Sequence, residues 1–332
     1  MAGIDSTWGS THLKRNEIFS AQIKEMFEQP LMAQQFVNWI GEIPADSQAT
    51  ELKINSFGDL QMDTWAESVS LPERRMDTGQ FLFRISQYPG LKVSFTDHFF
   101  ETSFMANEAL SRTPMKMQRA LGEYTETEIM KLANDQTNND ANTINAAMHR
   151  IVGSGDGTSL PTNALSIEDF AYAKYSLRKA GAPMTGLVAV VGPETEYLLN
   201  KTANIVDISN NPRWEGIVET GLGDTTGMRF IRNIYGFDVY VSDFLAKTDA
   251  DEAALTTADG TAVSSTDGYM ANMFFSLDGD AQPFIGAWGR SPRLVSWRDD
   301  DIETEYHQLT ASFGLGLYRP ESLVTVLSST DV

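Results

Sequence analysis

Hydrophobic residues recur at helical spacing most clearly in residues 114–133, PMKMQRALGEYTETEIMKLA. Met117, Leu121 and Tyr124 share one face of the helix that this spacing predicts, and polar residues such as Glu126 fall on other faces. Nothing in this segment has the spacing of a metal or cofactor site. We therefore predict a long packing helix.

The borders of this helix follow from its flanking residues. Thr113 suits an N-cap and Pro114 a first helical position, so we expect the helix to begin here, with residues 104–110 forming a separate turn or helix. The polar residues 134–145 should end the helix and begin another short helix that runs through Met148.

The N-terminal residues 1–50 show two narrow helical stripes with too little apolar surface for a core. We expect these short helices to dock on the main body or on another subunit. The two stripes contain the following residues: Phe19, Ile23, Met26 and Phe27, then Met32, Phe36, Val37 and Ile40.

The period changes to strict alternation in residues 51–96, which predicts strands that begin near Leu52, Phe81 and Leu91. The inner strands are joined by residues 64–79, TWAESVSLPERRMDTG, a segment longer than ordinary hairpin loops. It is either a surface loop or an extended β-hairpin that reaches another molecule.

The second half of the chain mixes helices and strands. Ser166 caps a predicted helix through Lys179, and Pro193 opens another. The apolar run 187–191 is typical of a strand buried on both faces. Further short strands are predicted at 237–241, 273–275, 284–288, 294–297, 309–317 and 323–327.

Two polar segments interrupt this pattern. Residues 153–162, GSGDGTSLPT, have the composition of a domain junction. Residues 248–268 lack any apolar period, so we expect an exposed, mobile insertion.

Composition narrows the functional classes. The 332 residues are 42% hydrophobic and 21% charged, as in globular proteins, and they contain no cysteine. The net charge is -20, and no cluster of basic residues stands out, so the chain should repel nucleic acid. No apolar run is long enough to span a bilayer, and the N-terminus lacks a secretory signal pattern.

The usual sequence signatures of catalysis are weak here. The four histidines, His12, His98, His149 and His307, are not at metal-ligand spacing. The glycine-rich residues 153–158 lack the lysine of a phosphate loop, and no GxSxG motif is present. We expect no catalytic, cofactor-binding or metal site, and therefore not an enzyme.

Six stretches that together span nearly the whole chain follow one another in a recognisable order. They are LKINSFGDLQMDTW, FLFRISQYPGLKVSFTDHF, SIEDFAYAKYSLRKAGAP, TGLVAVVGPETEYLL, GMRFIRNIYGFDVYVSDFL and LYRPESLVTVL. Their order resembles that in the major capsid proteins of tailed phages, whose HK-ninety-seven fold is shared with encapsulins and herpesvirus shells. No single motif is diagnostic; their order and spacing are similar to the family.

The resemblance implies an α+β fold with four parts. These are an N-terminal arm (1–50), an extended-loop hairpin or E-loop with flanking strands (51–100), a P-domain with a long spine helix (101–154 and 284–318), and an A-domain with a central β-sheet and flanking helices (155–283 and 319–332). The last strand, near residues 323–327, should return to the A-domain sheet.

The resemblance also implies the role and the partners. Copies of the chain should assemble as pentamers and hexamers into the icosahedral head of a tailed phage, in the bacterial cytoplasm, around double-stranded DNA that they do not recognise by sequence. We expect a portal, a possible decoration protein and a separate scaffolding protein, because only 50 residues precede the first strand, where some relatives carry a much longer scaffolding segment.

The N-terminal arm and the E-loop should overlap neighbouring subunits. Candidates for these contacts are Phe19, Ile23, Trp65, Val69, Leu71, Arg74, Arg75 and Met76. Some relatives join subunits covalently through an E-loop lysine, but no lysine lies between Lys53 and Lys92. We therefore expect a shell without that link.

Two alternatives stay open from the sequence. The first is an encapsulin-like compartment, with the same fold around a protein cargo. The second is a soluble α+β enzyme or carbohydrate-binding protein of unrecognised type. The six tryptophans and 18 phenylalanines are scattered through strand patterns, so core and interface packing explains them better than carbohydrate binding. The second predicts a small oligomer with a pocket of perturbed titratable groups.

Overall fold

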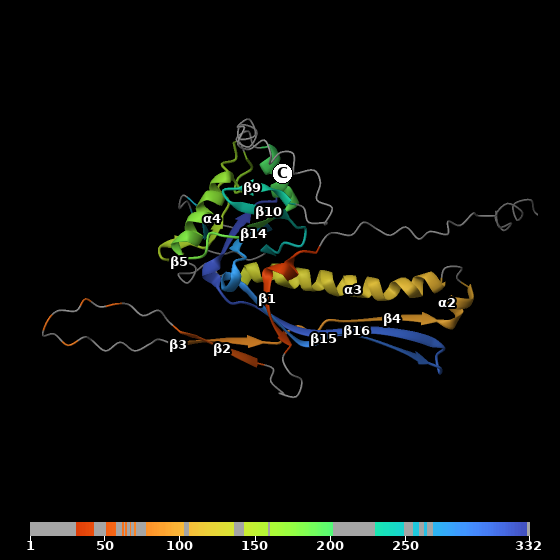
Figure 1. The fold of residues 1–332 in the computed structure, drawn as a ribbon. Helices are drawn as coiled ribbons and strands as arrows, with labels where there is room; N and C mark the ends of the chain where they lie inside the picture. The colour runs from red at the N-terminus through yellow and green to blue at the C-terminus, as the bar shows by residue number, and fades with distance from the viewer. Residues whose placement is uncertain are drawn as a thin grey trace, which may run out of the picture. The chain divides into compact units, whose positions relative to one another are not determined.

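A computed structural model describes most of the chain from Leu31 to Thr330 (Figure 1). The described residues are 31–42, 51–57, 62, 64, 67, 70, 78–102, 106–135, 143–158, 160–201, 230–248, 255–258, 262–263 and 268–330. Among them, no helix combines the length and apolar character needed to cross a membrane.

A seven-stranded mixed sheet forms one centre of the fold. Its strands follow the order β7-β17-β14-β8-β10-β9, and β11 also pairs with β14. Their bounds are β7 Arg150–Val152, β8 Leu187–Val191, β9 Phe230–Ile234, β10 Phe237–Val241, β11 Lys247–Thr248, β14 Tyr269–Ser276 and β17 Leu323–Ser328. The last strand thus joins this sheet, as expected.

Helices cover this sheet on both faces. On one face, α4 (Ile167–Lys179) packs Phe170 and Leu177 against Ala189 of β8 and Phe274 of β14, and α5 (Pro193–Lys201) adds further contacts. On the opposite face, Ile129 near the end of α3 belongs to the second large cluster. Every residue of β8 is buried, which confirms the strand buried on both faces.

The predicted cap of α4 is also confirmed. Ser166 and Asp169 form a capping box, in which the Asp169 carboxylate accepts hydrogen bonds from the Ser166 amide at 2.7 Å and the Ser154 hydroxyl at 2.7 Å. Burial raises the pKa of Asp169, and these hydrogen bonds partly offset the rise.

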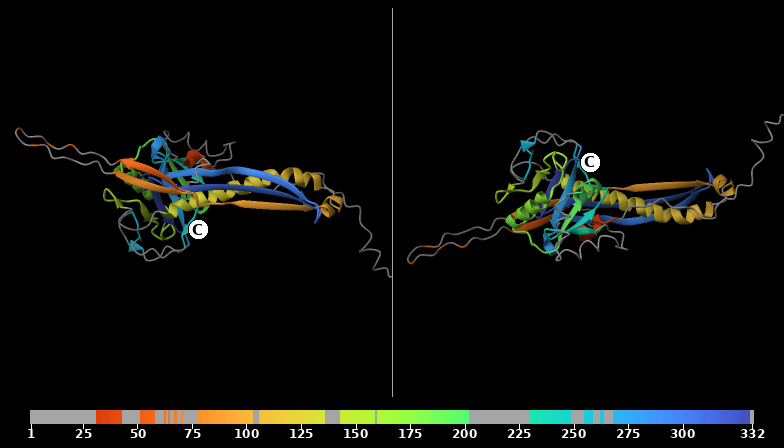
Figure 2. Two further views of the ribbon diagram at one scale, coloured as in Figure 1. Left: turned by 90° about the horizontal axis from the view of Figure 1, so that it is seen from below. Right: turned by 90° about the horizontal axis from the view of Figure 1, so that it is seen from above.

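A four-stranded sheet, in the order β1-β15-β16-β4, forms the second centre. The bounds are β1 Val37–Glu42, β4 Gly90–Thr96, β15 Phe284–Asp299 and β16 Thr304–Leu317. The helix α3 (Ala106–Lys131) runs along one face of this sheet (Figures 1 and 2). The hairpin β2–β3 (Glu51–Phe57 and Thr78–Arg84) extends from the same region.

The remaining described elements are short. They are η1 Ala33–Phe36, α2 Asp97–Thr102, η3 Leu132–Asp135, β5 Thr143–Ile144, β6 Ala147–Met148, β12 Leu255–Thr256, β13 Ala262–Val263, η5 Gly279–Ala281 and η6 Pro320–Ser322.

The structure corrects the predicted start of the long helix, because α3 begins at Ala106 and continues through Pro114. Proline removes one backbone hydrogen bond and costs about 3 kcal/mol in a helix interior. Good helix formers on both sides outweigh this local penalty, and the Thr113 hydroxyl donates to the Ala109 carbonyl at 2.8 Å within the helix rather than acting as a cap.

Two further helix predictions are wrong. Residues 33–36 form a 3-10 helix, but Val37–Glu42 is strand β1, which pairs in parallel with β15. After η3, the chain forms the β5–β6 hairpin instead of a second helix, with Asn145 and Ala146 at φ 50° and 61° in its turn.

The strands predicted separately at 284–288 and 294–297 are one continuous strand, β15. Its register against β16 shifts between Trp288 and Arg290 and again between Arg290 and Arg293. These bulges interrupt the alternation of side chains, which explains why the sequence pattern breaks there.

Candidate inter-subunit surfaces

The contact residues predicted from the sequence lie in the N-terminal segment and in the long loop after β2. All eight fall outside the residues that the structure describes: Phe19, Ile23, Trp65, Val69, Leu71, Arg74, Arg75 and Met76. Their contacts stay predictions. In the same loop, the Met62 side chain is 98% exposed.

The base of the β2–β3 hairpin, in contrast, is firmly seated. Phe83 is 2% exposed and packs with Ile285 and Ala287 of β15. A Cβ at Gly314 would lie 2.4 Å from the Arg84 carbonyl oxygen and 2.8 Å from the Phe83 ring. Glycine is therefore required where β16 meets the hairpin, and the hairpin leaves the sheet from a fixed seat.

The segment that leads out of the N-terminal region is held by Glu126 of α3. Its carboxylate accepts hydrogen bonds from the Met32 amide at 3.0 and 3.1 Å and from the Ala33 amide at 2.8 Å. These amides open η1 and have no partner within that short helix. Glu126 is fully buried, although the helical pattern suggested an exposed face.

The electrostatics of Glu126 reflect two opposed effects. Burial raises the pKa of this carboxyl, while the two backbone amides and the nearby Arg119 favour its charged form. Burial is the larger effect, so the pKa lies above its ordinary value.

Arg150 ties the other end of α3 to the seven-stranded sheet. Its side chain is 1% exposed, and its Nη1 donates to the Ala133 carbonyl at 3.1 Å, in the 3-10 turn that follows α3. Carbonyls at a helix C-terminus carry partial negative charge and attract a cation. The C-terminal end of the helix is thus fixed from within the core.

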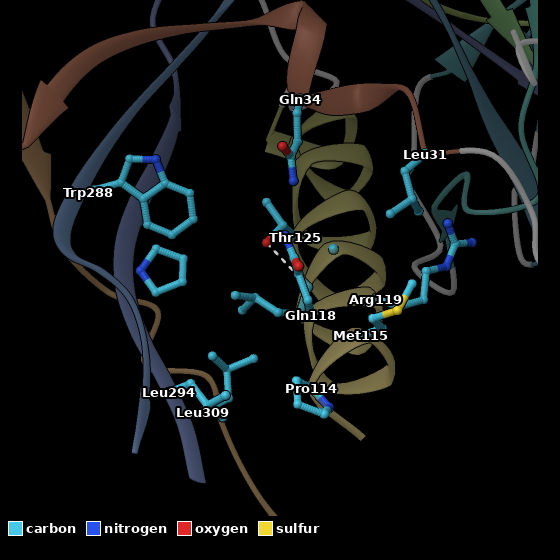
Figure 3. A pocket seen from close by; sticks show the side chains of 13 residues that line it. Leu31, Gln34, Pro114, Met115, Gln118, Arg119, Thr125, Trp288, Leu294 and Leu309 are labelled. Atoms are coloured by element: carbon cyan, nitrogen blue, oxygen red, sulfur yellow. Dashed lines mark hydrogen bonds between the residues drawn. The ribbon is translucent and has the colours of Figure 1, made fainter. Parts of the chain in front are cut away.

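Between the middle of α3 and the four-stranded sheet lies a groove of about 740 Å³ (Figure 3). Trp288, Leu294 and Leu309 line it from the sheet, and Pro114, Gln118 and Leu121 are among the residues that line it from the helix. A second hollow, of about 210 Å³, lies between α3 and the start of β4. The middle of the helix is therefore incompletely packed against the sheet.

The opposite face of the four-stranded sheet carries a small aromatic stack. The rings of Trp297 and Tyr306 lie 5.3 Å apart, and Lys92 Nζ lies 3.7 Å from the Tyr306 centroid and 5.0 Å from that of Trp297. Cations over such rings are attracted by the π-electrons. Trp297 is nonetheless 37% exposed.

Near the end of β15, ion pairs brace the sheet against α2. Arg298 Nη2 lies 2.5 Å from Asp97 Oδ2, and Arg298 Nε lies 2.8 Å from Asp300 Oδ1. Asp300 and Asp97 raise the pKa of Arg298. The ion pairs are exposed to solvent, so they orient this end of the sheet more than they stabilise it.

Three polar side chains meet beside this end of the sheet in an arrangement that suggests catalysis at first sight. His307 Nδ1 lies 2.7 Å from Ser296 Oγ, and His307 Nε2 lies 3.5 Å from Glu305 Oε1. Neither groove described above is lined by any of the three. Their register on neighbouring strands makes this a cross-strand polar contact. The described residues hold no cluster of three or more potential metal ligands.

Most of these anchoring residues have no recognisable signal in the sequence. Glu126 and Arg150 act through partners far along the chain, which no local pattern reveals. The alternation of glycine with bulky residues in FGLGL, residues 313–317, was a usable signal, because glycine in a strand often marks close approach of another segment.

Comparisons with known proteins agree with this geometry. A family model described as "Phage capsid protein" matches residues 80–326, more than half of the chain. No curated protein sequence matches the chain.

Solved structures with the same fold include capsids and an encapsulin. The capsid of cyanophage P-SCSP1u has a TM-score of 0.70 at 13% identity, with 100% of both chains covered. The Mycobacterium phage Che8 structure has a TM-score of 0.64 at 16% identity, covering 95% of this chain and 97% of that one. The SrpI encapsulin complex of Synechococcus elongatus PCC 7942 has a TM-score of 0.55 at 8% identity, covering 93% and 94%.

Identities this low show a shared fold alone, whereas the family match identifies the family. The match begins in β3 and ends in β17, so it includes α3 and most strands of both large sheets. The chain therefore belongs to the phage capsid protein family, and it is a major capsid protein with the HK-ninety-seven-like fold.

Proposed function

We propose that the chain assembles as pentamers and hexamers into the icosahedral head of a tailed bacteriophage and encloses its double-stranded DNA. The observation that carries this proposal is the uncovered part of the four-stranded sheet. All residues of β15 from Arg290 to Arg298 are exposed, including Leu294, Val295 and Trp297. Subunits that bury such surface against each other gain stability that one chain lacks.

The N-terminal arm and the E-loop would supply further contacts. Their attachment points are well anchored, by Glu126 at Met32 and by the Phe83 seat. We propose that Trp65, Leu71 and their predicted companions contact neighbouring subunits from there.

The division into a P-domain and an A-domain fits the two sheets. α3 with β15 and β16 would form the P-domain, and the sheet that includes β8, β14 and β17 would form the A-domain. β7 pairs with β17, which supports placing the proposed boundary before Arg150 and not near residue 154. β1 and β4 pair with β15 and β16, so we propose that they belong to the P-domain as well.

The family points to a structural role, and we propose that the subunit has no catalytic activity. Its net charge of -20 should keep it from binding the phosphates of the enclosed DNA. The absence of lysine between Lys53 and Lys92 supports a shell without covalent links from the E-loop. Assembly would take place in the host cytoplasm with separate scaffolding and portal proteins and a possible decoration protein.

Expression of the full chain, with size exclusion and electron microscopy, tests the assembly. Closed shells, or rings of five and six subunits, are the expected result, and a monomer that never assembles would contradict the proposal. A denaturing gel of the shells should show single subunits, and a ladder of linked subunits would exclude the non-covalent shell.

An encapsulin-like compartment is the second candidate, because an encapsulin shares the fold. Particles purified from infected or lysogenic cells would distinguish the two. Nuclease-protected DNA inside the particles supports the phage head, and a folded protein cargo without DNA supports the compartment.

A further inference from the structure

One face of the four-stranded sheet brings aromatic and basic side chains together. The register pairs Val295 with Gln308 and Trp297 with Tyr306, so alternate residues of β15 point to the side away from Leu294 and Leu309, which line the groove under α3. We call this side the aromatic face; it comprises Lys92, Arg293, Val295, Trp297 and Tyr306.

The aromatic face is uncovered among the described residues. In the view from below, β15, β16 and β4 lie in front and α3 lies behind them (Figure 2). Val295 and Trp297 are each 37% exposed, and Lys92 and Arg293 are exposed as well. β1 pairs with β15 only as far as Trp288, so among the described residues this part of β15 is paired on one edge only, with β16.

The chemistry of the face fits an acidic partner with an apolar centre. The rings of Trp297 and Tyr306 offer a flat apolar platform, and Lys92 and Arg293 place two positive charges beside it. Interfaces favour aromatic residues and arginine at their cores. Complementary charges then fix which partner binds and in which register.

The turn between β15 and β16 has the complementary chemistry. We call it the acidic tip; it comprises Asp299, Asp300, Asp301, Ile302 and Glu303. Ile302 is 55% exposed in the middle of four carboxylates. Arg298 pairs with Asp300, which leaves a net negative charge at the tip.

The tip of a subunit cannot cover its own aromatic face. Val295 and Asp299 are four positions apart on an extended strand, a distance of about 13 Å at about 3.3 Å per residue. The paired strands of the ribbon keep the tip pointing away from the face. Among the described residues, therefore, no segment of the same subunit covers Val295 or Trp297.

We propose that the acidic tip of one subunit docks on the aromatic face of a second copy. Ile302 would lie on the ring platform, with the flanking carboxylates beside Lys92 and Arg293. The inference rests on the proposed shell function, because it names a contact within that assembly. Packaged DNA fits less well, since the acidic tip borders the face and repels phosphates.

Cysteine cross-linking tests the contact directly, because the chain contains no cysteine of its own. Val295→Cys and Ile302→Cys chains are co-expressed, and the purified shells are oxidised. The expected product on a non-reducing gel is a dimer that contains one chain of each kind. Within one chain the two positions lie too far apart for a disulfide.

A matched control pairs Ile302→Cys with Tyr175→Cys, an exposed residue of α4 that should not meet the tip. Shells that form but give no mixed Val295–Ile302 dimer, or no more of it than the control, would overturn the contact. Dimers linked only through two Ile302→Cys chains would also overturn it, in favour of tip-to-tip contacts.

A charge exchange provides a second test that does not depend on cysteines. Lys92→Glu with Arg293→Glu, or Asp301→Lys with Glu303→Lys, should each lower the assembled fraction roughly tenfold because like charges then meet. All four substitutions in one chain should restore assembly. Circular dichroism of the unassembled variants checks that each subunit folds.

The outcomes separate this inference from the shell function. Failure of the unsubstituted chain to assemble would count against the shell function. Normal shells with both charge variants, or no recovery in the fourfold variant, would overturn only the tip contact. Shells of normal yield that retain less DNA with the Lys92 and Arg293 substitutions would assign the face to nucleic acid instead.

Discussion

The two sheets of this subunit differ in how much of their surface the chain itself covers. In the seven-stranded sheet, β8 is buried throughout, and α4 and the end of α3 pack on opposite faces. In the four-stranded sheet, β15 is exposed from Arg290 to Arg298, and even the covered face has a groove of about 740 Å³ beneath α3.

A buried polar side chain in the seven-stranded sheet shows how completely this sheet is packed within the subunit. Within the seven-stranded sheet, Asn272 is completely buried, and its Nδ2 donates to Ser328 Oγ at 2.7 Å and to the Val326 carbonyl at 3.1 Å. Its Oδ1 accepts the Gly192 amide at 3.2 Å. The polar atoms of this buried side chain thus find their hydrogen-bond partners within the subunit, so this part of the sheet needs no neighbouring chain. In the four-stranded sheet, by contrast, the described residues leave part of β15 exposed.

The largest expected effect is the loss of Phe274 from the seven-stranded sheet, and it contrasts with the loss of Trp297 from the four-stranded sheet. Phe274 is fully buried between Phe170 and Phe237, at ring distances of 4.9 and 5.4 Å. Phe274→Ala should lower the free energy of unfolding of the isolated subunit by about 3–5 kcal/mol. Trp297→Ala should cost about 1 kcal/mol or less, because the ring is 37% exposed.

Urea unfolding of the unassembled subunit measures both values, and electron microscopy measures assembly. Trp297→Ala should reduce shell formation despite its small effect on the subunit. Comparable losses of subunit stability for the two substitutions would erase the contrast between the sheets.

The anchor of the N-terminal segment should give the next largest effect. Glu126→Ala leaves the Met32 and Ala33 amides without their acceptor and should destabilise the subunit by about 1–3 kcal/mol. Hydrogen exchange should show faster exchange at these two amides and unchanged protection in β8. Uniformly faster exchange would mean that the anchor belongs to the same cooperative unit as the seven-stranded sheet.

Glu126 should also add a pH dependence to this anchor. Its pKa is raised in the folded subunit, so the folded state holds a proton at pH values where the unfolded state has lost it. The stability that protonated Glu126 contributes is complete below the unfolded pKa and is lost as the pH rises through the folded pKa.

Comparison with Glu126→Gln isolates this dependence, because buried Asp169 titrates in both proteins. The stability of the original chain relative to the variant should fall as the pH rises above the ordinary glutamate pKa of about 4.3. A difference that stays constant or grows with pH would contradict the raised pKa.

The hairpin seat offers a matched pair of glycines. Gly314→Ala forces a methyl group against the Arg84 carbonyl and the Phe83 ring and should cost about 1–3 kcal/mol. Gly90→Ala on β4 places its methyl group no closer than 3.8 Å to its neighbours, so it should be nearly neutral. Thermal unfolding compares the two. Equal effects would show that the seat of the hairpin is not tightly packed.

The smallest effect is expected for Lys92→Met. The substitution removes the cation above Tyr306 and keeps a side chain of similar length, so the isolated subunit should lose only about 0.5–1 kcal/mol. Shell yield should fall by more than this stability loss explains. Unchanged shell yield would show that the charge on this face is not needed for assembly.

The sequence predicted the seven-stranded sheet better than the four-stranded sheet. The α4 cap at Ser166 and the apolar run in β8 are local signals, and both were confirmed. In the other sheet, Val37 looked helical because its partner, β15, lies far along the chain. The predicted start of α3 at Pro114 was wrong, because the helix formers on both sides of the proline outweigh its tendency to end or begin a helix.

The contact surfaces were harder to predict than the fold. A stripe of apolar residues looks the same in a sequence whether it packs in a core or lies on the surface. The sequence therefore predicts a strand at residues 294–297 but not the aromatic face. The strongest pattern-based evidence was the resemblance in the order of segments, and the family match confirms it. The anchors Glu126 and Arg150 needed three-dimensional distances, because their partners lie in other elements.

The hydrogen bond between Arg150 and the Ala133 carbonyl has a mechanical consequence. It holds the C-terminal end of α3 against the seven-stranded sheet. α3 has 26 residues and is therefore about 39 Å long at 1.5 Å per residue. A tilt of about 5° at the pinned end would displace the free end by about 3 Å over that length. The length of α3 thus turns a small change of angle at the core into a shift of several ångströms at the far end of the helix.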